Sequence, residues 1–84
     1  MKHFTSSEFW AFYNRLPREI QELADKSYAL LKANPRYPSL QLKRIEELWS
    51  VRVGQHYRAL GIDAPDGIQW IWIGSHADYD RYLA

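Results

Sequence analysis

The residue types best suited to chemistry in this chain are basic ones, and they gather in the middle of the sequence. Five of them lie between residues 36 and 58, namely Arg36, Lys43, Arg44, Arg52 and Arg58. A guanidinium suits a phosphate group because its fork of donors holds two oxygens at once. His76 carries the side chain best matched to proton transfer near neutral pH. The net charge is only +1, so the distribution of charge is more informative than its total.

A β-hairpin is predicted to present two of these arginines. Apolar and polar side chains alternate along its first strand, in the order Trp49, Ser50, Val51, Arg52 and Val53. Such alternation is typical of a strand with one buried face, so we expect Arg52 to point away from the core. After a turn at Gly54-Gln55 the chain returns through residues 57–62. Arg58 shares a face with Arg52 if the register is favourable, whereas a one-residue slip would send it to the opposite face.

Two helices are predicted before the hairpin. Ser6 or Ser7 can cap the first, which should stop near Leu16 because a residue before proline disfavours the helical conformation. Pro17 suits the first turn of the second helix, which should run to about Asn34 with one apolar face.

The remaining segments complete an α+β domain that spans residues 1–84. A strand is predicted over residues 40–45, with Lys43 facing away from the helices. A turn is predicted over residues 63–67, where Gly67 is available for a positive φ. Residues 68–73 are nearly continuously apolar, which favours a strand inside the sheet. Residues 76–83 predict one or two helical turns. We therefore expect two N-terminal helices packed on a small antiparallel sheet of about four strands, followed by a short C-terminal helix.

Several classes of function are disfavoured by composition. The sequence has no cysteine, which excludes disulfides, thiolate zinc sites and cysteine nucleophiles. It has no apolar signal core and no run near the roughly 20 apolar residues of a membrane span, so we expect a soluble, cytoplasmic protein without a membrane partner. His76-x-Asp78 is a weak metal-like spacing without a third ligand, so neither a metal nor another cofactor is expected.

One ordered set of motifs resembles a known family. Residues 48–61 read Leu-Trp-Ser-Val-Arg-Val-Gly-Gln-His-Tyr-Arg-Ala-Leu-Gly, and Trp70-Ile71-Trp72-Ile73-Gly74-Ser75-His76 and Tyr79-Asp80 follow. The set is similar to toxins of the RelE/ParE superfamily from bacterial type II toxin–antitoxin modules. The resemblance covers nearly the whole chain, from Phe9 to Leu83.

The resemblance implies a metal-independent endoribonuclease, an mRNA interferase that cuts messenger RNA on the ribosome and so inhibits translation. In such chemistry the ribose 2′-hydroxyl attacks the adjacent phosphate, which requires a base, an acid and cations. The resemblance places Arg58 against the scissile phosphate and makes His76 the candidate general acid. Lys43 and Arg52 are candidate phosphate contacts, and Tyr79 is a candidate for stacking on a base.

Each of these roles has a structural alternative. Arg58 could be a solvated strand residue or pair with Glu46 or Glu47, one of which could instead act as the base. His76 could cap the last helix, and Tyr79 could pack against the sheet. The superfamily also contains inhibitors of DNA gyrase without nuclease activity, and a degenerate member would act only by binding. A cognate antitoxin is the expected partner, together with the ribosome and messenger RNA, or gyrase in the alternative.

Overall fold

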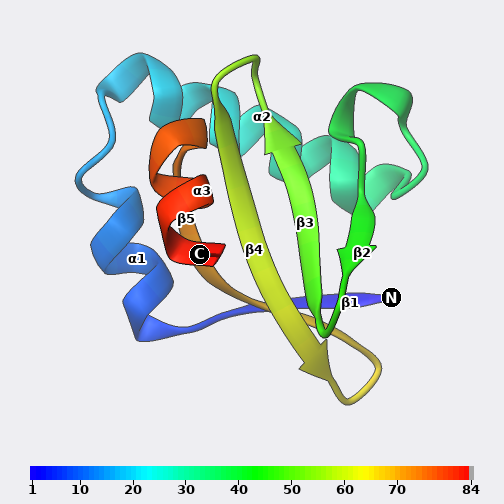
Figure 1. The fold of residues 1–84 in the computed structure, drawn as a ribbon. Helices are drawn as coiled ribbons and strands as arrows, with labels where there is room; N and C mark the ends of the chain where they lie inside the picture. The colour runs from blue at the N-terminus through cyan, green and yellow to red at the C-terminus, as the bar shows by residue number, and fades with distance from the viewer. Residues whose placement is uncertain (84) are drawn as a thin grey trace.

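One mixed sheet forms the centre of the molecule, with helices on both of its faces (Figure 1). The computed structural model describes residues 1–83. Its elements are β1 (Lys2–Thr5), α1 (Ser7–Tyr13), α2 (Arg18–Ala33), the 3-10 helix η1 (Pro38–Leu40), β2 (Lys43–Ile45), β3 (Leu48–Val53), β4 (Tyr57–Ala64), β5 (Gly67–Ser75) and α3 (His76–Leu83). The spatial order of the five strands is β1-β5-β4-β3-β2. The predicted α+β architecture is confirmed. Within residues 1–83, every helix is too short or too polar to span a bilayer.

The fifth strand, β1, was not counted among the expected four. It pairs in parallel with β5, so that Lys2 lies opposite Gly67 and Thr5 opposite Trp70. The pattern of side chains gave little signal for it, because three of its four residues are exposed. The backbone pairing of β1 with β5 is the main attachment of this strand to the sheet. Side chains add one link, in which the indole N–H of Trp70 donates to Nδ1 of His3 over 3.2 Å.

Protonation of His3 is expected to loosen this attachment. Burial lowers the pKa of His3, and the positive charges of the N-terminus and Lys32 lower it further. The stability that neutral His3 contributes is therefore complete above its unfolded pKa of about 6.5 and is lost as the pH falls through the lower folded value. Urea unfolding at about pH 7.5 and about pH 5 should show wild type losing stability relative to His3→Gln, which does not titrate. Parallel losses in the two proteins would contradict this.

The α1 and α2 helices cover one face of the sheet. The hydroxyl of Ser6 caps α1 by accepting from the N–H of Phe9 at 3.2 Å. The α1 helix ends at Tyr13, three residues before the predicted stop, and Pro17 precedes α2 rather than lying inside it. Under these helices is a core cluster of buried side chains that includes Leu31, Leu40, Val51, Val53, Ala59, Ile68, Trp70 and Ile73.

The opposite face is also covered, which corrects the expectation of a single buried face for β3. In Figure 1, α3 lies across β4 and β5 on the side away from α2. Tyr79 of α3 packs there with Leu60 and Trp72 in a second core cluster. Ser50 lies on the same face of β3 as Arg52, where the alternation predicted exposure, and it is fully buried at 0% exposure. The two-sided burial also explains why β5 is nearly continuously apolar.

Two loops differ from their predicted conformations. The strand predicted for residues 40–45 begins only at Lys43, because Pro38–Leu40 form η1 and Gln41 takes a left-handed conformation with φ 46°. In the turn between β4 and β5, Asp66 rather than Gly67 adopts the positive φ, at 65°. Asparagine and aspartate tolerate this region better than most residues, and Gly67 is needed for a different reason, its close approach to β1.

Candidate functional site

The sheet face beneath α3 carries three of the basic side chains, Lys43, Arg52 and Arg58. Arg52 of β3 lies directly opposite Arg58 of β4, so the register that the sequence left open places both arginines on one face. Lys43 of β2 lies opposite Ser50 of β3. Because Ser50 and Arg52 are two residues apart on one strand, Lys43 belongs to the same face. The structure thus brings together the three cations that the sequence selected.

The two arginines interact with neutral acceptors. Arg52 Nε donates to the carbonyl oxygen of Gly54 at 2.8 Å. Arg58 donates from Nη1 to Oγ of Ser50 and from Nη2 to Oε1 of Gln41, each at 3.4 Å. Neither guanidinium forms an ion pair with a carboxylate within residues 1–83. Like charges directly opposite each other in a sheet are unfavourable, so a bound anion would relieve this repulsion.

Tyr79 supports Arg58 from α3. The guanidinium carbon of Arg58 lies 5.5 Å from the centroid of the Tyr79 ring, within the range of a cation–π contact. Tyr79 itself is only 7% exposed and belongs to the core cluster beneath α3. The ring therefore packs against the sheet, which was the structural alternative for this residue, and little of its face is open to a stacked base.

His76 is the first residue of α3 and lies at the edge of the same site. Its ring centroid is 5.6 Å from that of Tyr79, so Tyr79 is a common neighbour of Arg58 and His76. The helix cap comes from Ser75, whose Oγ accepts from the N–H of Asp78 at 3.1 Å, and not from the His76 side chain. His76 Nδ1 lies 3.5 Å from a carboxylate oxygen of Asp80, and about half of its side chain is exposed. The imidazole is therefore accessible to a ligand.

The backbone of His76 anchors α3 to the hairpin. Its N–H donates to the carbonyl oxygen of His56 at 2.7 Å, which ties the start of the helix to the turn between β3 and β4. This turn begins with Gly54 at a positive φ of 64°. The β3–β4 hairpin therefore carries Arg52 and Arg58, and the hydrogen bond to His56 attaches His76 of α3 to the same hairpin.

Glu46 and Glu47 do not approach this site. They form the turn between β2 and β3, five residues before Arg52 on β3. At about 3.3 Å per residue this separates Glu47 from Arg52 by roughly 16 Å along the strand. Neither glutamate is placed to pair with Arg58 or to act beside it as a base. Across residues 1–83, no three histidine, aspartate or glutamate side chains converge as metal ligands would.

Two residues of the site were not selected as functional from the sequence. Ser50 and Gln41 supply the acceptors that hold the two ends of the Arg58 guanidinium. The alternation along β3 places Ser50 on the face of Arg52, so its position was predictable although its burial was not. The position of Gln41 depends on the left-handed turn after η1, which no local pattern of residues predicted.

Comparison with known proteins assigns the fold to a family. Residues 18–81 match the sequence model of the ParE-like toxin domain. The chain belongs to this family. As a RelE/ParE-type toxin it also shares its fold with solved relatives, whereas no curated protein shows a significant sequence match.

Three solved structures illustrate the likeness of this toxin to its relatives. The RelB–RelE antitoxin–toxin complex of Methanococcus jannaschii contains a chain that is 16% identical, with 96% of this chain and 99% of that chain covered and a TM-score of 0.75. The YoeB/ParE toxin of Agrobacterium tumefaciens is 16% identical, with 90% and 99% covered and a TM-score of 0.68. The intact RelBE complex of E. coli gives 13% identity, coverage of 87% and 93%, and a TM-score of 0.63. At these identities the likeness concerns the fold.

Proposed function

We propose that this toxin is a ribosome-dependent messenger RNA endoribonuclease. The observation that carries the proposal is the Arg52–Arg58 pair, which lies on one sheet face without a carboxylate partner within residues 1–83. A phosphodiester supplies the negative charge that this pair lacks. The exposed imidazole of His76 stands beside the same site and adds a group that can transfer a proton at neutral pH.

The reaction that fits these groups is an internal transesterification. The 2′-hydroxyl oxygen of one nucleotide forms a bond to the adjacent phosphorus and loses its proton to a water molecule, while the bond from phosphorus to the 5′-oxygen breaks. Arg58 holds the non-bridging oxygens, on which negative charge increases in the transition state. His76 donates a proton to the departing 5′-oxygen. The products are a 2′,3′-cyclic phosphate and a 5′-hydroxyl end.

Arg52 and Lys43 bind neighbouring parts of the RNA backbone in this proposal. Both lie on the face of Arg58, and Lys43 is exposed at the edge strand β2. Contacts of this kind position a strand without reading its sequence and weaken as salt is added.

A cognate antitoxin is the proposed protein partner. Two of the solved relatives, from Methanococcus jannaschii and E. coli, are complexes of a RelE toxin with a RelB antitoxin. By analogy, a protein encoded beside this toxin would bind it and suppress the proposed cleavage. Co-expression of the two should restore growth and yield a complex that purifies as one species.

Induced expression in a bacterial host tests the proposed activity. The 5′ ends of cellular messages are mapped by primer extension, and a DNA-damage reporter is followed in the same cultures. New cuts within translated reading frames, without reporter induction, are the expected result. Intact messages with a strong DNA-damage response would overturn the nuclease and favour inhibition of gyrase. Absence of growth arrest would favour a member that acts only by binding.

Replacement of Tyr79 tests its contact with Arg58. Tyr79→Phe keeps the ring beneath the guanidinium and should leave messenger RNA cleavage within about twofold of wild type. Tyr79→Leu fills much of the same space without a π face, and a cation–π contact is worth about 0.5–2 kcal/mol, so cleavage should fall roughly 2- to 30-fold. Single-turnover cleavage of messenger RNA on programmed ribosomes by the purified variants measures both. Equal rates for the two variants would exclude a role for the ring in positioning Arg58.

A further inference from the structure

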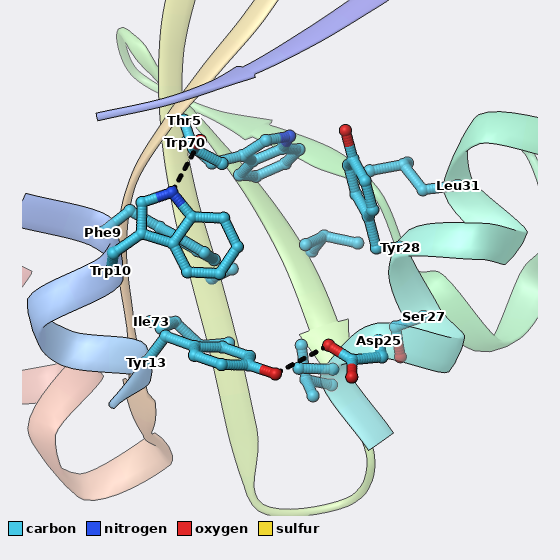
Figure 2. A pocket seen from close by; sticks show the side chains of 14 residues that line it. Thr5, Phe9, Trp10, Tyr13, Asp25, Ser27, Tyr28, Leu31, Trp70 and Ile73 are labelled. Atoms are coloured by element: carbon cyan, nitrogen blue, oxygen red, sulfur yellow. Dashed lines mark hydrogen bonds between the residues drawn. The ribbon is translucent and has the colours of Figure 1, made fainter. Parts of the chain in front are cut away.

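A separate cavity lies between α1 and α2, on the face of the sheet opposite Arg58. Its volume is about 140 Å³. Figure 2 shows Trp10 and Tyr13 on one side, Tyr28 on the other and Trp70 at one end. The rings of Trp10 and Tyr13 meet at 77° with centroids 5.1 Å apart, so they form two walls of a corner. Phe9 completes a set of five aromatic side chains around the space.

The size of the cavity limits its occupant to a group of a few heavy atoms. An engineered protein cavity of about 150 Å³ admits benzene, so a space of similar volume can hold a ligand head of that size. Trp10 and Tyr28 are both partly exposed, at 47% and 38%, so the cavity opens to solvent between the helices. A ligand can therefore enter without unfolding of either helix.

The polar groups around the cavity do not favour an anion. The indole N–H of Trp10 donates to Oγ1 of Thr5 at 3.0 Å, and that of Trp70 donates to His3. The Tyr13 hydroxyl donates to Oδ1 of Asp25 at 2.8 Å. Each of these three donors already has an acceptor within the protein. Asp25 is the charged residue among those that line the cavity. What the cavity offers a ligand is a set of π faces and a negative charge.

We infer that this cavity binds a small alkylated ammonium group, of the size of trimethylammonium, on a soluble molecule. The ring faces attract such a cation, and the carboxylate of Asp25 complements its charge. Asp25 has no ion-pair partner within residues 1–83, so its charge is available to a ligand. Tyr28 already makes one contact of this kind outside the cavity lining, since Nζ of Lys32 lies 4.6 Å from the centroid of its ring. This site is independent of the proposed nuclease.

The test compares choline with its neutral isostere 3,3-dimethyl-1-butanol. The full-length, ¹⁵N-labelled protein is titrated with each compound while the indole N–H signals are followed by NMR. Choline should shift the signals of Trp10 and Trp70 in a saturable manner and leave Trp72 unchanged, because Trp72 lies in the core cluster beneath α3. The isostere should bind at least about fivefold more weakly, the difference expected from a cation–π contact of about 1 kcal/mol.

A pair of carboxamide variants controls for the charge. Asp25→Asn keeps an acceptor for Tyr13 and should weaken choline at least about threefold without affecting the isostere. Asp66→Asn removes an exposed carboxylate outside the cavity and should change neither affinity. Equal affinity for the two compounds would overturn the proposal and leave an apolar docking surface for another chain. Failure of choline to shift Trp10 saturably would also overturn it.

Discussion

Arg58→Ala is expected to lower messenger RNA cleavage on programmed ribosomes by at least about 100-fold. Removal of a single preorganised donor to a developing negative charge typically costs about 10²- to 10³-fold in rate, and Arg58 supplies two donors together with a charge. Arg58→Lys keeps the charge but loses the fork, so an intermediate loss of roughly 10-fold is expected. Single-turnover cleavage with purified ribosomes and saturating toxin measures both.

The folded state should tolerate the change at Arg58. Its hydrogen bonds to Ser50 and Gln41 are long, at 3.4 Å each, and its removal relieves the repulsion from Arg52. The relief of this repulsion is offset by loss of the contact with Tyr79, so thermal unfolding of Arg58→Ala should stay within about 5 °C of wild type. Arg18→Ala is the matched control, because it deletes the same charge from an exposed position on α2. Wild-type cleavage by a folded Arg58→Ala variant would remove Arg58 from the mechanism.

Gly67→Ala is expected to produce the largest loss of stability among the glycine-to-alanine changes on β5. A β-carbon at Gly67 would lie 1.9 Å from the carbonyl oxygen of Lys2. That oxygen belongs to the backbone of β1, so no change of rotamer can remove the clash. Overpacking usually costs about 1–3 kcal/mol, and we expect the upper end of that range. Thermal unfolding should then shift down by more than about 10 °C.

A double-mutant cycle identifies the cause of this loss. In a chain that lacks residues 1–5 the clash is absent, and alanine should be tolerated or even favoured over glycine by about 0.5–1 kcal/mol. Lys2→Ala is the control for the side chain and should change stability by less than about 0.5 kcal/mol, because Lys2 meets Gly67 through its backbone. An equal cost of Gly67→Ala in the full and shortened chains would assign the effect to β5 itself.

The hairpin was the part of the fold that the sequence predicted best. Alternation along residues 49–53 and the turn at Gly54 were sufficient to place β3 and β4, because period-two burial is a local signal. The pairing of Arg52 with Arg58 required the register, which depends on the turn conformation and on packing from other elements. The burial of Ser50 could not be predicted, because it depends on packing from other elements, among them Arg58 of β4, whose Nη1 donates to Oγ of Ser50.

The two segments whose secondary structure was predicted incorrectly, residues 2–5 and 40–42, are determined by backbone conformation rather than by a pattern of side chains. Residues 2–5 lack an apolar pattern, and only the ladder to β5 makes them a strand. Residues 40–42 were predicted as part of a strand because two leucines alternate there, but Pro38 favours a local turn and Gln41 takes a left-handed conformation. The site depends on this turn through the contact of Gln41 with Arg58. Its lysine, arginine and histidine positions were predictable, and so was the face on which Ser50 lies, whereas the contact of Gln41 with Arg58 was not.

The pairing of β1 with β5 sets an order of events during synthesis. Lys2 leaves the ribosome long before Gly67, yet the two must lie side by side in the finished sheet. The hairpin with both arginines also emerges before α3, which brings Tyr79 under Arg58 and ties His76 to the turn. Contacts between distant parts of a chain form late in folding. A nascent toxin therefore has no assembled site while its own messenger RNA is still being read through residues 67–83.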